Sequence, residues 1–266
     1  MNKIEISVVI PTFNRALLVC DAVDSVLNQT YINYIKEVII VDDGSTDNTE
    51  EVVKEKYSNN DIVKYYKKIN GGVSSARNYG MSVAEGNWIA LLDSDDEWLE
   101  DKIKFQVETI IKHNNIDFIG TDYDDCCLKI GLKKINSLYK ANIKDLCIKF
   151  FPVTPSMLFK KVIYQEIGGF NELQKYAEDG EFCLRICEKY NYYHLPISLV
   201  KIGHGKRSFG DSSGLSGNLK GMYLGNISNI KQLKKRKIIS KRFYLFLRIF
   251  YYFKYLRRII IVMINN

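Results

Sequence analysis

The feature that most constrains the fold is a repeated alternation, through the first half of the chain, of short apolar runs with segments of helical periodicity. The runs are rich in Val and Ile and apolar at almost every position, which is typical of strands buried on both faces of a parallel sheet. The pattern therefore predicts an α/β fold with a mostly parallel sheet flanked by helices. The strands are expected at residues 6–10, 38–41, 62–66, 88–92 and 116–120, and the helices at 17–27, 47–57, 72–85 and 98–112.

Two caps are expected among these helices: Asn14 ahead of the first and Asp47 ahead of the second. Beyond residue 125 the pattern is less regular. Residues 125–170 predict short strands and loops, followed by a helix at 178–190, a strand at 195–202 and a Gly/Ser-rich loop at 203–218.

Acidic side chains follow two of the predicted strands. Asp42 and Asp43 follow the second strand, and Asp93, Asp95 and Asp96 follow the fourth. Ligands of open α/β sheets bind at the carboxyl ends of the strands. Three carboxylates within four residues repel one another, so a hard cation such as Mg²⁺ or Mn²⁺ is expected among them. Such ions are usually held by one or two carboxylates and by substrate phosphates, which points to a nucleotide ligand.

Four motifs in order resemble those of family 2 glycosyltransferases: VVIPTFNR, VDDGSTD, NGGVSSARNYG and LLDSDDEW. The resemblance covers roughly residues 5–205. It implies the GT-A fold, a Rossmann-like nucleotide-binding architecture, and a metal-dependent, inverting transfer from a nucleotide sugar. The expected donor is a UDP-sugar and the expected acceptor a glycan or a lipid-linked glycan, in bacterial surface polysaccharide synthesis.

The resemblance assigns five residues to the nucleotide. Pro11 and Thr12, at the end of the first predicted strand, match positions that line the base. Asp43 matches an acid that hydrogen-bonds uracil, whose N3–H is a donor. Arg77 matches a residue near the nucleotide, where a guanidinium neutralises phosphate, and Asp93 matches an acid near the ribose.

The resemblance also implies a metal site for Mn²⁺ or Mg²⁺. Asp95 matches the metal-binding acid, and Asp96 is the alternative ligand because the register of the motif is ambiguous. His204, at the start of the Gly/Ser-rich loop, is a further candidate near the metal or the diphosphate, and Lys206 and Arg207 are candidates for phosphate.

An inverting transfer needs a general base that takes the proton of the acceptor hydroxyl. Asp179 matches the base of the family, at the start of the predicted helix 178–190, and the adjacent Glu178 is the alternative. A helix N-terminus favours the ionised carboxylate that a base requires. Trp98 matches a bulky position near the sugar or acceptor, although packing at a helix start explains it as well.

The charge of the chain is divided unevenly along its length. Residues 1–188 carry a formal charge of −8 and residues 189–266 carry +15, which together give +7. We therefore expect a catalytic domain at 1–205 and a basic, aromatic-rich helical extension at 206–266. Residues 231–266 suit an anionic membrane surface; packing of a helical pair on the catalytic domain or on a second copy is the alternative. With no signal peptide expected, the enzyme is placed in the cytoplasm or on the inner face of the membrane.

Two other classes of protein compete with this reading. A nucleic-acid-binding protein would use the basic end but leaves the acids after the strands unexplained, and the chain has no RRM, KH or zinc motif, so nucleic acid is not an expected partner. A sugar-phosphate nucleotidyltransferase would carry a Gly-rich loop after the first strand, where this chain has PTFNRALL.

Overall fold

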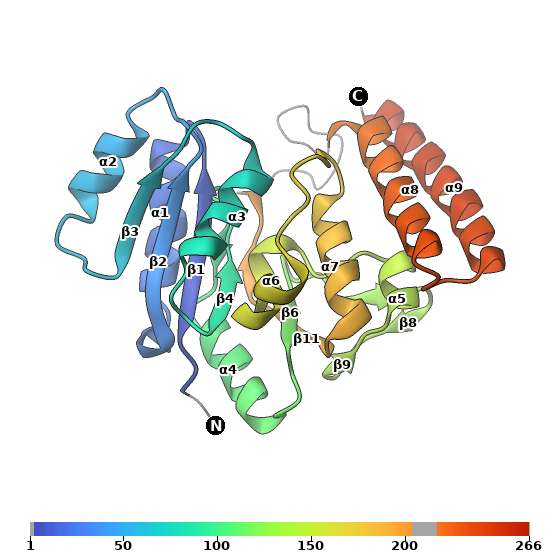
Figure 1. Ribbon diagram of the computed structural model, residues 1–266, viewed down its shortest axis with the longest axis horizontal. Helices are drawn as coiled ribbons and strands as arrows, with labels where there is room; N and C mark the ends of the chain where they lie inside the picture. The colour runs from blue at the N-terminus through green and yellow to red at the C-terminus, as the bar shows by residue number, and fades with distance from the viewer. Residues whose placement is uncertain (1–2, 204–216, 266) are drawn as a thin grey trace.

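The computed structural model describes residues 3–203 and 217–265, which are built around one large sheet (Figure 1). In sheet order its strands are β3 (Val63–Lys67), β2 (Ile35–Asp42), β1 (Ile6–Thr12), β4 (Trp88–Leu91), β10 (Leu158–Lys160), β6 (Phe118–Asp122), β11 (Tyr192–Ser198) and β9 (Tyr139–Lys140). Neighbours β3, β2, β1 and β4 are parallel, and so are β6 and β11. The predicted mostly parallel sheet is confirmed.

Strand β10 runs antiparallel to both of its neighbours, β4 and β6. It comes from the region where the sequence pattern is least regular, and no local pattern there indicates its direction. Its insertion divides the sheet into a first half, encoded by residues up to 91, and a second half that includes β6 and β11.

The sheet is covered on both faces, and its central strands supply two separate hydrophobic cores. In β1, Val9 packs into one core while Val8 and Ile10 pack into the other. Helices α3 (Val73–Val83) and α7 (Glu178–Lys189) cover the first face, and α1 (Ala16–Leu27) and α4 (Lys102–Lys112) cover the second. Burial on both faces explains why the strand sequences are apolar at consecutive positions.

Three expected helix starts are wrong. Asn14 does not cap α1; its φ is 52° and its side chain accepts a hydrogen bond from the Thr46 amide at 2.8 Å. Helix α2 (Thr49–Lys56) begins after Asn48, although Asp47 does accept from the Thr49 amide at 3.1 Å. Trp98 lies in a short strand. Asn14 is held by the loop after β2 and Trp98 by its pairing with β12, whereas Asp47 bonds to the first residue of α2 from one position before the N-cap.

The remaining elements are short, apart from two helices near the C-terminus. They are η1 (Ile32–Tyr34), β5 (Glu97–Trp98), which pairs with β12 (Val200–Lys201), β7 (Lys129–Ile130), β8 (Lys133–Lys134), α5 (Ile143–Ile148), η2 (Thr154–Ser156), α6 (Lys161–Ile167), α8 (Leu219–Lys235) and α9 (Lys241–Asn265).

The C-terminal helices form a pair on one side of the molecule, with α8 packed on α7 and α9 along the outer edge (Figure 1). Leu233 of α8 and Leu247 and Tyr251 of α9 belong to the core on the α3–α7 face of the sheet. The Tyr251 hydroxyl donates to the Cys147 carbonyl at 2.8 Å, which fixes α9 against α5. None of the helices within 3–203 and 217–265 has the length and apolar character that crossing a membrane requires.

Candidate functional site

The carboxyl ends of β1, β2 and β4 lie next to one another at one edge of the sheet. Thr12 pairs with Asp42 in the parallel register of β1 and β2, and the Asp43 amide donates to the Thr12 carbonyl at 2.9 Å. Because β1 lies between β2 and β4, the acids that follow those two strands flank the end of β1 on either side. We call this region the carboxylate edge.

Asp43 is nearly buried and has three hydrogen-bond donors around its carboxylate. They are the Lys68 ammonium at 2.8 Å, the Gly71 amide at 3.0 Å and the Gly72 amide at 2.6 Å. A carboxylate has about four lone-pair positions, so room for one further donor remains. Gly72 has a φ of +86°, in the left-handed region that favours glycine, and it directly precedes α3. Asp43 therefore joins the end of β2 to the start of α3.

Arg77 of α3 lies at the centre of the carboxylate edge, with its side chain 5% exposed. Its guanidinium donates to Asp93 at 2.6 Å and to Glu178 at 3.5 Å, and lies 5.1 Å from the centre of the Phe170 ring. Burial alone would lower the pKa of Arg77, but the surrounding carboxylates of Asp93, Glu178 and Asp179 outweigh it and raise that pKa. Arg77 thus links the acids after β4 to the start of α7.

Glu178 and Asp179 open α7, after Ala177 in a left-handed conformation with a φ of 55°. Burial, reinforced by the charge of Asp179, raises the pKa of Glu178 to about 7 even though Arg77 opposes the shift. Desolvation also raises the pKa of Asp179, against the Gly180 amide that donates to its carboxylate at 2.7 Å. Asp179 stays partly exposed whereas Glu178 is buried on Arg77.

The three acids after β4 each have a different partner. Asp93 accepts from Arg77, Asp95 forms an ion pair with Arg15 at 2.8 Å, and Asp96 accepts from the Gly203 amide at 2.7 Å. Burial, and then the nearby charges of Asp93 and Asp95, raise the pKa of Asp96 to about 8. Asp96 is therefore protonated more readily than a solvated aspartate, because it is buried beside two other carboxylates.

The remaining predicted residues lie partly within and partly outside the part of the chain that the structure describes. Pro11 and Thr12 are buried at the end of β1, and the Thr12 hydroxyl has no hydrogen-bond partner among the described residues. His204, Lys206 and Arg207 lie outside the described residues. Across residues 3–203 and 217–265, no group of three or more His, Cys, Asp or Glu side chains is arranged to hold a metal ion.

Trp98 is a packing residue within the described structure. Its indole N–H donates to the Pro155 carbonyl at 2.7 Å, its ring lies 3.8 Å from the Lys102 ammonium, and only 4% of it is exposed. These contacts hold Trp98 in the protein interior, in agreement with the alternative expectation that it is a packing residue.

Sequence reasoning missed two cations of the carboxylate edge, Arg15 and Lys68. Arg15 follows β1 and reaches Asp95 after β4 because those two strands are neighbours in the sheet. Lys68 follows β3 and reaches Asp43 after β2 for the same reason. The available signal was a basic residue just beyond a strand end, but using it requires the strand order.

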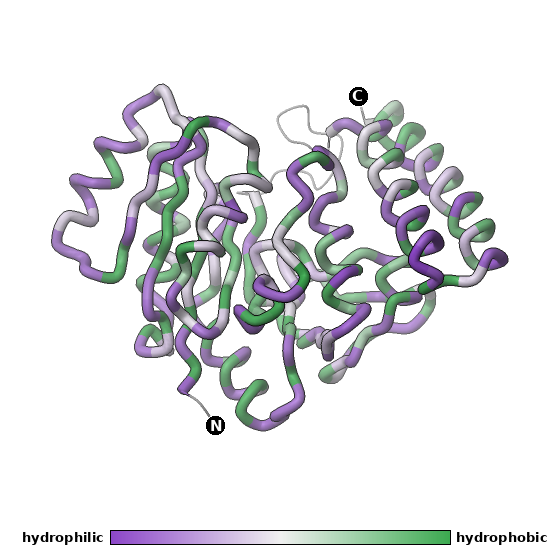
Figure 2. Tube along the Cα trace, in the orientation of Figure 1, coloured by the Kyte–Doolittle hydropathy of each residue, from purple (hydrophilic) through white to green (hydrophobic). Residues whose placement is uncertain are grey.

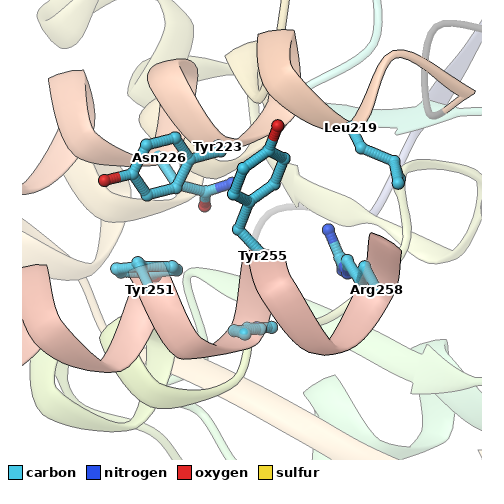
Figure 3. Close-up of a pocket in the computed structure, with 7 residues that line it drawn as sticks. Leu219, Tyr223, Asn226, Tyr251, Tyr255 and Arg258 are labelled. Carbon is cyan, nitrogen blue, oxygen red and sulfur yellow. The ribbon is translucent and has the colours of Figure 1, made fainter. Parts of the chain in front are cut away.

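A separate hollow lies between α8 and α9, away from the carboxylate edge (Figure 3). It is shallow and partly open to solvent, and the stacked rings of Tyr223 and Tyr255, whose centres are 5.0 Å apart, lie beside it. Its lining consists of Leu219, Tyr223, Asn226, Tyr251, Lys254, Tyr255 and Arg258. No member of this lining belongs to the acids or cations of the carboxylate edge.

Comparison with known proteins agrees with this architecture. The profile described as Glycosyl transferase family 2 matches residues 7–168. A hyaluronan synthase of Pasteurella multocida is 40% identical over 201 residues, which cover 75% of this chain and 20% of that protein. The chain spans 35% and 63% of the length of two further relatives, both called uncharacterised glycosyltransferases of Rickettsia.

Two solved structures share the fold. That of S. aureus TarS residues 1–349 with UDP-GlcNAc has a TM-score of 0.68 at 22% identity, covering 85% of this chain and 66% of that one. That of the mannosyltransferase PcManGT from Pyrobaculum calidifontis, with GDP-Man and Mn²⁺, has a TM-score of 0.66 at 17% identity, covering 88% and 65%. The predicted GT-A fold is confirmed.

Proposed function

The chain belongs to glycosyl transferase family 2, and from that premise we propose that it transfers a sugar from a nucleotide-sugar donor to a glycan in bacterial surface polysaccharide synthesis. One observation carries the proposal. Arg77 brings together Asp93, which follows β4, and Glu178, which opens α7, so residues expected to serve the donor and the acceptor form one charged cluster. A UDP-sugar is the proposed donor, and a free or lipid-linked glycan the proposed acceptor.

The nucleotide is assigned to the ends of β1 and β2. The unpartnered Thr12 hydroxyl and the remaining lone pair of Asp43 supply hydrogen-bonding capacity for a base there. Pro11 packs beside them. Asp93 faces the ribose, and Arg77 and Arg15 are the guanidinium groups within reach of a diphosphate placed at the carboxylate edge.

The acids after β4 fit a divalent cation, Mn²⁺ or Mg²⁺. The fit rests on the donor set, three neighbouring carboxylates, because such ions prefer oxygen ligands. Asp95 is the proposed ligand, since Asp96 is buried and holds the Gly203 amide; Asp96 and His204 are the alternatives. A bound metal would act as a Lewis acid toward the departing diphosphate.

Asp179 is the proposed general base of an inverting transfer. Its carboxylate takes the proton of the acceptor hydroxyl as that oxygen bonds to the anomeric carbon and the bond to the diphosphate oxygen breaks. Partial exposure favours Asp179 over Glu178, whose carboxylate is already engaged by Arg77. A raised pKa makes Asp179 a stronger base than a solvated aspartate, provided that it is ionised.

Calorimetric titration with UDP, GDP and dTDP, in Mn²⁺ and then in EDTA, tests the donor assignment. We expect UDP to bind in Mn²⁺ and to bind far more weakly in EDTA or to the Asp95→Asn variant. Asp117→Asn is the matched control, because Asp117 directly precedes β6, at the edge of the sheet opposite the carboxylate edge, and pairs there with Lys160. Binding of none of the three nucleotides would contradict the proposal.

A further inference from the structure

Helix α9 presents many apolar side chains to solvent and turns two of its cationic side chains toward the protein. Its inner side carries Leu247 and Tyr251, but also Lys254 and Arg258, which line the hollow against α8. Burial and the neighbouring charges of Arg258, Lys149 and Arg257 lower the pKa of Lys254 to about 8. In water the reverse arrangement is favoured, with apolar residues inside and cations outside.

The outer side of α9 is apolar along almost its whole length, and Figure 2 shows hydrophobic residues recurring from one end of the helix to the other. Its exposed apolar residues, between 49% and 76% accessible, are Leu245, Phe246, Ile249, Tyr252, Phe253, Ile260, Met263 and Ile264. We call this set the outer stripe. At 1.5 Å per residue it extends for roughly 28 Å.

The outer stripe differs from the other apolar side chains that the protein exposes. Ile69, Leu132 and Leu173 are each more than 90% accessible, but they lie singly in different loops. Isolated exposed apolar residues are ordinary, whereas a contiguous exposed patch marks an interaction site. The outer stripe therefore needs a partner that accepts apolar side chains.

Cations border the outer stripe. Arg248 and Arg257, both exposed, fall on opposite edges of it at 100° per residue. The turn between α8 and α9 adds a cluster of exposed cations. These are Lys234, Lys235, Lys237, Lys241 and Arg242.

The charge around the stripe determines the chemistry of the partner. Residues 212–266 contain no Asp or Glu, so the surface offers cations without carboxylates. A second copy docked through the same face would bring more cations and no opposite charge. An anionic lipid bilayer supplies both an apolar interior and a negative surface, and attracts basic segments next to it.

We propose that the outer stripe of α9 docks on an anionic lipid bilayer. The helix lies in the plane of the interface, with the stripe at the boundary of the acyl chains and the cations of the α8–α9 turn on the headgroup phosphates. The inner face of α9 stays packed on α8 and α5, so docking needs no unfolding of the pair. This attachment is independent of the proposed transferase activity.

Co-sedimentation of the full chain with vesicles tests the proposal. We expect binding to phosphatidylcholine vesicles that contain phosphatidylglycerol, and little binding to phosphatidylcholine alone. The double variant Ile249→Ser/Phe253→Ser should lower the partition coefficient by roughly a hundredfold, since each side chain contributes about tenfold. Ile69→Ser/Leu173→Ser, which removes two still more exposed apolar side chains from loops, is the matched control and should bind as the unchanged chain does.

The cations are tested separately with Lys235→Gln/Lys237→Gln/Lys241→Gln. At about fivefold for each charge near the surface, binding to the anionic vesicles should fall by roughly a hundredfold. Three results would overturn the proposal: no binding of the unchanged chain to anionic vesicles, equal binding of the stripe variant, or equal binding to neutral vesicles. Light scattering that finds a dimer, made monomeric by the stripe variant, would also overturn it and assign the face to a second copy.

Discussion

The carboxylate edge and the α8–α9 pair differ in how their charged side chains are paired. At the carboxylate edge, acidic and cationic side chains from different parts of the chain form ion pairs, Asp43 with Lys68 and Asp95 with Arg15. In the α8–α9 pair, cations accumulate along a segment that contains no acid at all. The ion pair of Arg236 with Glu188 joins this surplus of cations to the acidic body.

This difference gives a physical interpretation of the uneven charge along the sequence. A site whose charges are largely matched inside the protein is organised before its ligand arrives, because its side chains are already oriented by one another. A surface with charges of one sign depends on something outside the protein to match them. The body and the C-terminal end therefore serve different partners.

The largest expected effect is on the transfer rate, and it distinguishes residues of catalysis from residues of membrane attachment. Asp179→Asn should lower the transfer rate by about 10²- to 10⁴-fold, the usual contribution of a general base, while donor affinity stays the same. Ile249→Ser, on the outer stripe, should leave transfer to a water-soluble acceptor unchanged. Turnover and donor titration measured on both variants make the comparison. Normal turnover by Asp179→Asn would move the role to Glu178 or remove it.

Stability should also differ between the two regions. Arg77→Gln leaves Asp93 and Glu178 without their shared cation, and breaking a buried pair in this way costs about 3–5 kcal/mol in unfolding free energy. Arg236→Gln removes a partly exposed ion pair of α8 and should cost less than about 1 kcal/mol. Urea unfolding gives both values. Equal losses would mean that the carboxylate edge is no more tightly organised than the surface.

The pH dependence of stability sharpens the same contrast. The pKa of Glu178 is raised from 4.5 to about 7, so the folded protein holds this proton more tightly than the unfolded chain does. Its contribution to stability is therefore fully present below about pH 4.5 and is lost as the pH rises through 7. Urea unfolding across this range should show the decline, and Glu178→Gln should remove it. An unchanged slope in that variant would rule out Glu178 as its source.

The smallest expected effect concerns the backbone of the carboxylate edge. Gly72→Ala places a side chain at a φ of +86°, which costs about 1 kcal/mol, although no atom lies within 4 Å of the added carbon. Gly131→Ala, at a φ of +61° with equally open space, is the matched control. Both should lose similar stability, but only the change at Gly72, whose amide binds Asp43, should weaken UDP binding in calorimetry. Equal affinities would show that this amide does not position Asp43.

Much of the fold could be predicted from the sequence because burial on both faces leaves a strong local signal. All five strands predicted between residues 6 and 120 exist, as β1, β2, β3, β4 and β6. Helix α7 begins at Glu178 as expected. Helix starts were less accurate: Asn14 and Asp47 are typical capping residues, yet Asn14 binds the loop after β2 and Asp47 binds Thr49 from one position before the N-cap. The direction of β10 depends on which strands flank it, and no local pattern encodes that.

The acidic residues of the candidate site could be predicted from the sequence, but their contacts could not. Asp43, Asp93 and Asp95 follow strands, and strand ends can be located from periodicity. Their partners Lys68, Arg77 and Arg15 depend on the order of strands in the sheet and on the packing of α3, which are properties of the whole chain. The apolar outer face of α9 was hidden for the same reason, since its two sides are told apart only once its packing on α8 is known.

The two hydrogen bonds of Arg77 have a consequence for how relatives of this protein diverge. Arg77 and Glu178 are 101 positions apart in the sequence, and Asp93 is 16 positions from Arg77, yet one guanidinium serves both acids. Replacing the arginine leaves both acids without their shared cation, whereas replacing one acid leaves the arginine paired with the other. We therefore expect a lineage that replaces the arginine to alter both acids as well, while either acid alone varies more freely.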